Sequence, residues 1–329
     1  MPTRATIVVT DYNFADLAME QAVLADSACT LIGHHCKDTP ELIAAVTQAD
    51  AVITQFARVD ARVIGAMSKA RAIVRYGIGV DNVDLDAARA LAIPVCNIPD
   101  YCIDEVADHT LAFILGLTRQ VVTHTTDIRG GNWRLAGPMA AMRVLREQTV
   151  GVIGFGRIGR EVVQRLLAFK CRVLVHDPVV EVSQIASAGA SAVSLDEIFA
   201  RSDVLTLHCP STPATRQLLN SANLAKMQPG AMLVNLARGD LVDTPALVAA
   251  LQNGQLAAAA LDVFDPEPLP ADHPLRSLSN VIVAPHIASA SPTAVRKLRE
   301  GAARRALAAV LGELPPNVVN GVTLPRRFA

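Results

Sequence analysis

Short apolar runs alternate with amphipathic segments along the first hundred residues. The runs are rich in β-branched residues, as buried strands are, and the segments between them carry apolar residues at helical spacing. Such alternation predicts a parallel sheet with helices on both faces. The expected strands are Thr6–Thr10, Cys29–His34, Ala51–Thr54, Ala72–Tyr76 and Pro94–Ile98. The expected helices are Phe14–Ala25, one beginning at Thr39 as its N-cap, Asp60–Met67 and Asp84–Leu91.

The pattern changes after residue 102. One long apolar helix is expected over Ile103–Val122, followed by a looser segment, Arg129–Arg146, that contains the single Trp133. We interpret this segment as an arm or linker that suits a dimer contact, with simple packing of its apolar side chains as the alternative. Six further strand patterns follow, near residues 150–154, 172–176, 204–208, 231–236, 257–263 and 280–284. A closing amphipathic helix, Pro292–Leu311, is expected to return to the first domain.

Composition narrows the class of protein. The chain has 329 residues, a length typical of two domains, and half of its residues are apolar. A formal charge of −1 favours neither nucleic acid nor an anionic membrane surface as a partner. No apolar run is long enough to span a membrane, and we expect no signal peptide, because the first residues lead directly into a strand pattern. Six cysteines without a C-x-x-C pair indicate buried, reduced thiols in a cytoplasmic protein and no metal site.

A glycine-rich turn follows the strand near residue 150. Gly154, Gly156 and Gly159 have the G-x-G-x-x-G spacing. In such turns the first glycine allows a sharp bend, the second lets a pyrophosphate approach the backbone, and the third lets the helix pack closely on the strand. The anion lies at the positive end of that helix. A second apolar strand and Asp177, 18 residues past Gly159, complete a dinucleotide-binding pattern.

Asp177 bears on the choice of dinucleotide. A carboxylate at this position would accept hydrogen bonds from the ribose hydroxyls and repel a 2′-phosphate, so the expected cofactor is NAD. The alternative is an aspartate that only caps the end of its strand. A second glycine turn, Arg75–Asn82, follows a strand of the first sheet and is a candidate anion site, or else an ordinary tight turn.

Three polar residues follow strands of the second sheet: Arg238, Glu267 and His286. All three are expected at the carboxyl edge of the sheet, where the nicotinamide would bind. A guanidinium can grip a carboxylate, an imidazole can exchange a proton near neutral pH, and a carboxylate can orient the imidazole and favour its charged form. Oxidation of an α-hydroxy acid requires these roles. The alternatives are a surface salt bridge, a loop acid and a structural histidine.

Taken together, these motifs resemble the D-specific 2-hydroxyacid dehydrogenases, a family that includes phosphoglycerate, glyoxylate/hydroxypyruvate and D-lactate dehydrogenases. The stretch Val95–Thr110 is similar to the branch that includes the C-terminal-binding protein corepressors. The resemblance extends over essentially the whole chain. Its motifs are Tyr76–Asn82, Gly154–Gly159, Leu233–Asp243, Leu261–Pro268 and Pro285–Ser289.

The resemblance implies an α/β fold of two doubly wound parallel-sheet domains. A flavodoxin-like substrate domain, or lid, would comprise residues 1–101 and 287–329. A Rossmann NAD-binding domain would comprise residues 102–286, including an interdomain helix and a dimer arm. The implied partners are a small 2-hydroxy or 2-keto acid and a second copy of the chain.

The resemblance also assigns roles to individual residues. The substrate carboxylate and carbonyl would bind Arg238, His286 would be the general acid and base, and Glu267 would hold the histidine. The substrate carboxylate would also bind the turn formed by Gly77, Ile78 and Gly79, with Arg75 nearby. The cofactor residues would be Thr110, Gly154, Gly156, Arg157, Ile158, Gly159, Asp177, Cys209, Pro210, Ala237 and Asp262.

The expected reaction is reversible hydride transfer between NAD and a D-2-hydroxy acid. Two alternatives remain: an NAD(H)-sensing, corepressor-like binding protein, and a dehydrogenase acting on phosphite. The corepressor relatives have a tryptophan three residues past the histidine, where this chain has Ser289, and this difference weakens the first alternative. The loop Gln55–Val59 is expected to line the substrate side-chain pocket, and the sequence does not identify the hydroxy acid.

Overall fold

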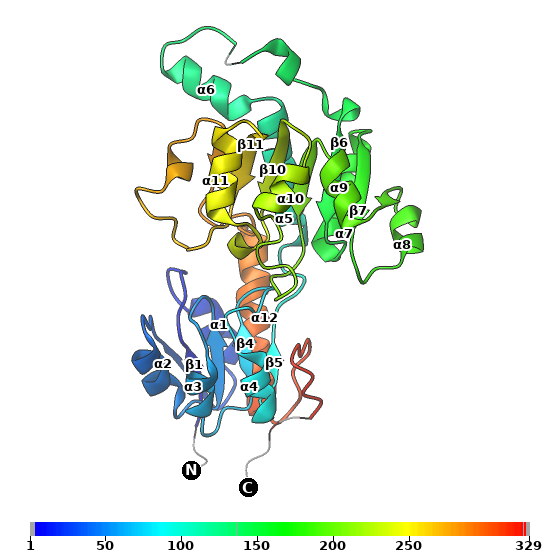
Figure 1. Cartoon of the computed structure of the whole chain (residues 1–329). Helices are drawn as coiled ribbons and strands as arrows, with labels where there is room; N and C mark the ends of the chain where they lie inside the picture. The colour runs from blue at the N-terminus through cyan, green and yellow to red at the C-terminus, as the bar shows by residue number, and fades with distance from the viewer. Residues whose placement is uncertain (1–3, 136, 325, 327–329) are drawn as a thin grey trace. The chain divides into compact units, whose positions relative to one another are not determined.

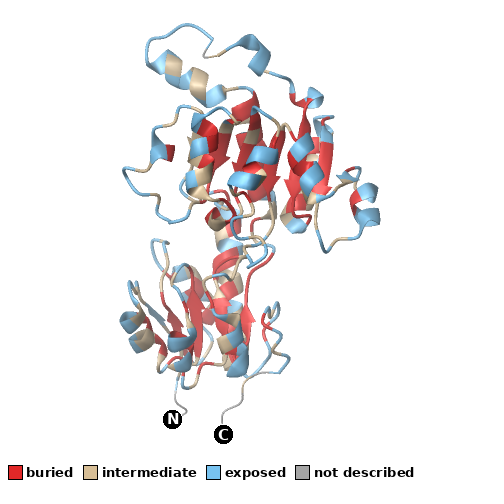
Figure 2. Cartoon of the chain, viewed as in Figure 1, coloured by how far each residue is buried: buried red, intermediate tan, exposed pale blue. Residues whose placement is uncertain are grey.

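The computed structural model describes residues 4–135, 137–324 and 326. The chain forms two compact units, Met1–Tyr101 with Ser291–Ala329, and Cys102–Ala290. The backbone N–H groups of Ile287 and Ala288 donate to Asp262 within the second unit. Each unit is an α/β layer structure with a buried parallel sheet (Figure 1, Figure 2).

The first unit contains a five-stranded parallel sheet in the order β2-β1-β3-β4-β5. This is the flavodoxin-like order. Its strands are β1 Ala5–Val9, β2 Cys29–Gly33, β3 Ala51–Thr54, β4 Ile73–Arg75 and β5 Val95–Cys96. Its helices are α1 Ala18–Leu24, α2 Thr39–Val46, α3 Ala61–Gly65, α4 Leu85–Ala90 and α12 Pro292–Val310.

Apolar side chains cover both faces of this first sheet. On one face, Ile7 and Ile53 pack with Leu24 of α1 and Ala302 of α12, so the last helix does return to the first unit. On the other face, Val8 and Val52 pack with residues of α2, α3 and α4. Because both faces are covered, the strands have the near-continuous apolar composition from which the sheet was predicted.

The N-cap of α2 differs from the expectation. Asp38, and not Thr39, is the cap: its side chain accepts a hydrogen bond from the backbone N–H of Glu41 at 2.9 Å. Thr39 and Pro40 are the first two helical residues. Proline is favoured there because the first turn of a helix has no intrahelical acceptor for its N–H.

The second unit contains a seven-stranded parallel sheet in the order β12-β11-β10-β9-β6-β7-β8. This is the Rossmann order 3-2-1-4-5-6 with one further edge strand. The expectation of six strands missed β8, which is only two residues long and lacks a buried apolar run. The strands are β6 Thr149–Ile153, β7 Arg172–His176, β8 Ser191–Ala192, β9 Val204–Leu207, β10 Ala231–Asn235, β11 Leu256–Leu261 and β12 Val281–Val283.

Helices pack on both faces of this second sheet. The helices α5 and α7 pack against each other and against the strands, whereas α9, α10 and α11 bury a cluster around Phe199 and Leu247. A capping box between Ser194 and Glu197 begins α9. The helices are α5 Ile103–Thr118, α6 Val121–Arg129, α7 Arg157–Ala168, α8 Val182–Ser187, α9 Leu195–Arg201, α10 Ser221–Lys226 and α11 Thr244–Gln252. Short 3-10 turns occur at Met139–Ala141, Leu145–Glu147, Gly239–Leu241 and Pro274–Arg276.

The single helix expected over Ile103–Val122 is wrong. The helix α5 ends at Thr118, Gln120 has a left-handed backbone (φ 51°), and α6 begins at Val121. The apolar face of α5 is buried, whereas α6 has no buried residue, so the packing that sustains α5 stops at the break. Figure 1 shows α6 and the following segment extending from the second unit as an arm.

No helix in the described part of the chain is both long and apolar enough to cross a membrane. All six cysteines are free thiols, and four of them are buried, with Cys36 and Cys209 half-buried.

Candidate active site

The glycine turn after β6 has the geometry that its spacing predicts. Gly154 has a φ of +98°, and a Cβ there would lie 2.6 Å from the backbone carbonyl of His208. A Cβ on Gly159 would overlap the Gly154 carbonyl oxygen, whereas Gly156 faces open space. The helix α7 begins at Arg157, and within the described residues no side chain caps its first N–H groups. The turn therefore presents unobstructed backbone donors at the positive end of a helix.

The Asp177 carboxylate braces this turn. Its Oδ2 accepts a hydrogen bond from the Phe155 N–H at 2.7 Å, and its Oδ1 accepts from Val179 and Val180 at 2.9 and 3.0 Å. Partial burial raises the pKa of Asp177, but the hydrogen bonds from the three N–H donors lower it by more. The net pKa of Asp177 therefore lies below the ordinary value. Asp177 thus does cap its strand end, and Oδ2 retains a lone pair that can accept a further hydrogen bond.

The residues after β9 form the wall beside Gly154. His208 accepts or donates a hydrogen bond at 3.0 Å between its Nε2 and the Thr206 hydroxyl, and burial lowers its pKa to about 4. Burial also raises the pKa of the half-buried Cys209 to about 11, and Pro210 is exposed. The side chains of His208 and Cys209 are therefore neutral at pH 7.

Thr110 lies inside α5 and is fully buried. Its hydroxyl donates to the Val106 carbonyl at 2.7 Å, one turn earlier in the same helix. The structure gives this side chain a hydrogen bond of its own within the helix, so Thr110 is the weakest of the cofactor candidates.

His286 and Glu267 form a hydrogen-bonded pair at the carboxyl edge of the second sheet. The His286 Nδ1 lies 2.9 Å from Glu267 Oε2, and about one third of each side chain is exposed. Glu267 Oε1 also accepts the Phe264 N–H at 2.7 Å. Burial raises the pKa of Glu267, but hydrogen bonds from His286 and Phe264 and the positive charges of His286 and Arg238 outweigh it, so the net pKa is lowered.

An ionised Glu267 fixes the orientation of the imidazole. The carboxylate accepts the proton on Nδ1, which leaves Nε2 as the nitrogen that can take up or give a proton. Arg238 follows β10, near enough to Glu267 to lower its pKa, and its Nη1 donates to the Ala237 carbonyl at 2.7 Å. The three residues predicted from their strand ends are thus brought to one edge of the sheet.

Asp262 lies at the same edge but is fully buried. Its two carboxylate oxygens accept the N–H groups of Ile287 and Ala288, each at 2.8 Å. Its neighbour on the next strand, Asn235, is also buried and was missed in the sequence. The Asn235 side chain accepts the Ala237 N–H and donates to the Arg238 carbonyl. A polar residue ending an apolar strand is the signal that identifies both positions.

The glycine turn of the first unit follows β4. Gly77 has a φ of +148°, and the Arg75 guanidinium occupies the space that a Cβ would need. The Gly77 carbonyl accepts the Ile98 N–H at 2.9 Å, and the Ile78 carbonyl accepts the Asn97 side-chain amide at 2.7 Å. Within the described residues, the N–H groups of Ile78 and Gly79 donate to no protein acceptor. They are half-buried and can bind an anion.

A buried network of hydrogen-bonded ionic residues holds Tyr76, the residue that precedes this turn. The Tyr76 hydroxyl donates to Glu20 Oε1 at 2.8 Å, and Arg299 of α12 donates to both oxygens of the same carboxylate, at 2.8 and 2.6 Å. Glu20 is fully buried and Arg299 nearly so. The network therefore ties the end of β4 to α1 and α12 within the first unit.

Asp11, in the first unit, is a further residue that was missed in the sequence. Its carboxylate accepts the backbone N–H groups of Gln55, Phe56 and Ala57, between 2.6 and 3.1 Å. These donors at the end of β3 are therefore already occupied by an internal anion, unlike those of the turn after β4.

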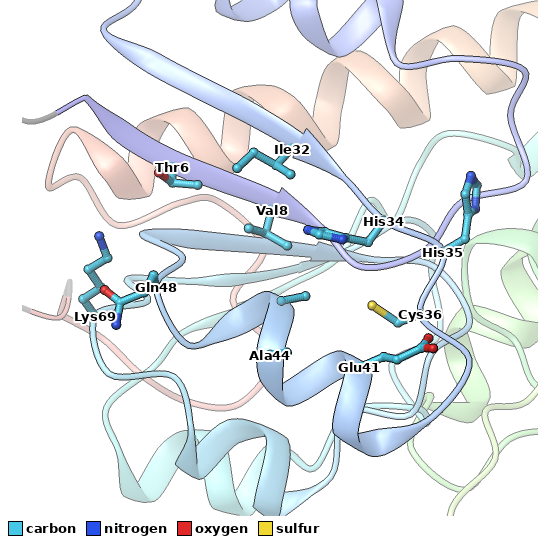
Figure 3. A pocket seen from close by; sticks show the side chains of 11 residues that line it. Thr6, Val8, Ile32, His34, His35, Cys36, Glu41, Ala44, Gln48 and Lys69 are labelled. Atoms are coloured by element: carbon cyan, nitrogen blue, oxygen red, sulfur yellow. The ribbon is translucent and has the colours of Figure 1, made fainter.

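A hollow of about 660 Å³ lies elsewhere on the first unit, over β1, β2 and α2 (Figure 3). Its walls include Val8, Ile32, His34, Cys36 and Glu41, and none of the predicted site residues. Across the described ranges, no three His, Cys, Asp or Glu side chains are arranged to hold a metal ion. The predicted site residues therefore lie outside this hollow.

Comparison with known proteins identifies the family of the chain. Residues 111–288, more than half of the chain, match the family model described as D-isomer specific 2-hydroxyacid dehydrogenase, NAD binding domain. The chain is 37% identical to a glyoxylate reductase of Thermofilum pendens, over 91% of each protein. It is 39% identical to the D-3-phosphoglycerate dehydrogenase of Mycobacterium tuberculosis, over 86% of this chain and 53% of that protein. It therefore spans about half the length of this relative.

The solved structures show the same fold. The crystal structure of D-lactate dehydrogenase from Aquifex aeolicus, complexed with NAD and lactic acid, has a TM-score of 0.83 and 30% identity over 93% of this chain and 96% of that one. The sheet order and the glycine turn define a protein with a Rossmann NAD-binding domain. The chain belongs to the D-isomer specific 2-hydroxyacid dehydrogenase family, as its motifs predicted.

Proposed function

We propose that the protein is an NAD-dependent dehydrogenase that interconverts a D-2-hydroxy acid and the corresponding 2-keto acid. The observation that carries the proposal is the His286–Glu267 pair beside Arg238, at the carboxyl edge of the NAD-binding sheet. An acid–base group, a carboxylate that orients it and a permanent cation are what this reaction needs from the protein.

The residues of the second unit fit the cofactor. Gly156 faces open space and the first N–H groups of α7 are uncapped, which suits a pyrophosphate held by the backbone of Arg157, Ile158 and Gly159. Asp177 is placed to bind the adenosine ribose, Cys209 and Pro210 to border the adenine, and Ala237 to border the nicotinamide. When bound, NAD supplies the hydride acceptor or donor.

The protein side chains then handle the proton and the charge. In the oxidation direction, Nε2 of His286 takes the hydroxyl proton of the substrate while Glu267 stabilises the imidazolium. Arg238 holds the substrate carboxylate and polarises the developing carbonyl. In the reduction direction, the imidazolium returns the proton. Within the first unit, the turn from Gly77 to Gly79, with Arg75, is itself suited to bind a carboxylate.

The experiment that tests this function is a steady-state panel that follows NADH consumption. Its substrates are glyoxylate, hydroxypyruvate, pyruvate, phosphohydroxypyruvate and longer 2-keto acids, with phosphite plus NAD as a further arm. The expected result is turnover of at least one keto acid, and a loss of roughly 10²–10⁴-fold in the His286→Gln variant. Tight NADH binding without turnover of any substrate would instead indicate an NAD(H)-sensing protein.

We further propose that the arm mediates a homodimer. Large apolar side chains are exposed along it: Trp133 is 92% exposed, Met139 73% and Val121 55%. A monomer rarely leaves so many in one segment uncovered. Light scattering should give twice the mass of the chain, and a Trp133→Ser/Met139→Ser variant should give the single mass. An unchanged mass would exclude the arm as the interface.

The free cysteines favour a reducing compartment, and we place the protein in the cytoplasm. Fractionation of the producing cells with antibody detection tests this location.

A further inference from the structure

Three polar side chains from distant parts of the chain meet inside an apolar cluster of the first unit. Glu20 of α1 is fully buried, and Tyr76 and Arg299 of α12 are nearly so. Tyr76 itself belongs to the cluster, which also contains Ile53 and Leu298. A charge is costly to bury unless it is paired and hydrogen-bonded, so the arrangement requires a physical reason.

The Glu20 carboxylate is the centre of this group. Its Oε1 accepts from the Tyr76 hydroxyl and from Arg299 Nε, both at 2.8 Å, and its Oε2 accepts from Arg299 Nη2 at 2.6 Å. Such a bidentate pair fixes orientation as well as distance. The guanidinium also lies over the Phe14 ring, 4.7 Å from its centroid, and the Tyr76 ring packs edge-on against the same ring. Both the ring and the hydroxyl of Tyr76 are therefore held in place.

Stability alone does not explain this buried ion pair. Apolar side chains of similar volume often replace such a pair without loss of stability, and sometimes with a gain. The surrounding cluster is already formed by apolar residues of β1, β3, α1 and α12, so it offers a suitable environment for them. The ion pair provides something that apolar contacts lack, which is a single fixed acceptor for the Tyr76 hydroxyl.

Tyr76 directly precedes the Gly77–Gly79 turn, so its position sets where the turn begins. Gly77 then adopts a φ of +148°. At the other end, Ile98 and Asn97 hold the two carbonyl groups of the turn by donating hydrogen bonds to them. Because the carbonyls are occupied in this way, the backbone N–H groups of the turn remain for an anion.

We infer that Glu20 and Arg299 are positioning residues, which act through the Tyr76 hydroxyl to hold the Gly77–Gly79 turn in the shape that binds the substrate carboxylate. This inference rests on the proposed function. A hydrogen bond to a charged group depends on its alignment and contributes about tenfold or more to affinity. A small displacement of the turn should therefore weaken carboxylate binding, while the protein stays folded.

The main test replaces the whole group with apolar side chains, in the variant Glu20→Leu/Tyr76→Phe/Arg299→Met. Urea unfolding should give about the same midpoint as the parent, because the buried charges are removed together. On a keto acid that the parent reduces, KM should rise about tenfold. The kcat and the NADH Kd, measured by fluorescence, should stay the same. A folded variant with the KM of the parent would overturn the inference.

Tyr76→Phe isolates the hydroxyl, because it leaves the ring packing and the Glu20–Arg299 pair in place. We expect KM to rise about fivefold, somewhat less than in the apolar variant. Tyr12→Phe is the matched control: Tyr12 packs against the same cluster, and within the described residues its hydroxyl makes no hydrogen bond. If the apolar variant does not fold, Tyr76→Phe carries the test, and an unchanged KM there would overturn the inference.

A double-variant cycle tests whether Tyr76 acts through the ion pair. In the Glu20→Leu/Arg299→Met background, Tyr76→Phe should cause no further rise in KM, because the hydroxyl has already lost its acceptor. A further tenfold rise there would overturn the inference, since the hydroxyl would then act on the substrate itself.

Binding of oxalate separates this inference from the proposed function, because oxalate is a carboxylate that needs no hydride transfer. In the ¹⁵N-labelled parent with NADH present, oxalate should shift the amide signals of Ile78 and Gly79. In the apolar variant its affinity should be about tenfold lower. The Ile98 amide, which donates to the turn, should also exchange faster with solvent. Equal oxalate affinity, unchanged exchange or no shift in the parent would overturn the inference, whereas binding without turnover of any keto acid would overturn only the proposed function.

Discussion

The chain contains two glycine turns, one in each unit, and they use glycine for different reasons. Both follow a strand of a parallel sheet, and both contain a glycine with positive φ, at Gly77 and Gly154. At Gly154 the missing Cβ makes room for the backbone of His208 and Cys209, which cannot move. At Gly77 it makes room for the end of the flexible Arg75 side chain. Packing and backbone conformation together therefore require glycine at Gly154, whereas backbone conformation alone requires it at Gly77.

Each turn is held by one brace, a side chain that hydrogen-bonds to the backbone of the turn, and the two braces differ in charge. The turn of the second unit is held by the carboxylate of Asp177, and that of the first by the neutral amide of Asn97. A carboxylate beside a nucleotide site disfavours a further negative group such as a 2′-phosphate. The neutral amide of Asn97 adds no negative charge beside Arg75. We propose that this difference in charge suits the two turns to different ligands.

The largest expected effect is that of Gly154→Ala. A Cβ 2.6 Å from the His208 carbonyl, in a left-handed backbone, combines overpacking with strain and should cost about 3 kcal/mol or more of unfolding free energy. Urea unfolding measures the loss, and NADH fluorescence should show no binding. Gly156→Ala is the matched control, because its Cβ enters open space and should leave stability unchanged. Equal stability of the two variants would contradict the packing requirement for glycine at position 154.

The next largest effect concerns His208, whose backbone packs against Gly154. The folded pKa of His208 is about 4 against an ordinary 6.5, so between these values the unfolded chain binds a proton that the folded chain excludes. Stability is therefore complete above about pH 6.5 and falls as the pH drops to 4, by at most about 3 kcal/mol. Urea unfolding of the parent and of His208→Gln across this range should show the loss only in the parent. Parallel curves would contradict the burial of the imidazole.

The first-unit turn should respond differently. Gly77→Ala must displace the Arg75 guanidinium and strain the backbone, at a cost of about 2 kcal/mol in stability. Because Arg75 moves, KM for the keto acid should rise about tenfold while the NADH Kd stays the same. Arg75→Ala is the companion variant, and it should raise KM without the loss of stability. A changed NADH Kd in Gly77→Ala would show that the two turns do not have separate ligands.

Much of this picture could be predicted from the sequence, because strand-length apolar runs and glycine spacing are local signals. The parallel sheets, the turn at Gly154 and the strand-end positions of Arg238, Glu267 and His286 follow from such signals. The break at Gln120 could not be predicted, since apolar periodicity continues through it and only the loss of packing ends α5. The hydrogen bonds of Asp262 reach Ile287 and Ala288 in a later part of the chain, which no local pattern encodes. Those of Asn235 reach only Ala237 and Arg238, so its position at the end of an apolar strand was a usable local signal.

The smallest expected effect tests the charge of the second brace. Asp177→Ala removes the negative charge beside the turn and leaves the Phe155 N–H without its acceptor. We expect the preference for NADH over NADPH, measured as the ratio of kcat/KM values, to fall about tenfold, equivalent to about 1.4 kcal/mol. Asp196→Ala, which removes an exposed carboxylate paired with Lys226, is the control and should leave the ratio unchanged. If Asp177→Ala weakened both cofactors equally, its carboxylate would serve only to hold the turn, and the difference in charge between the two braces would have no part in selecting their ligands.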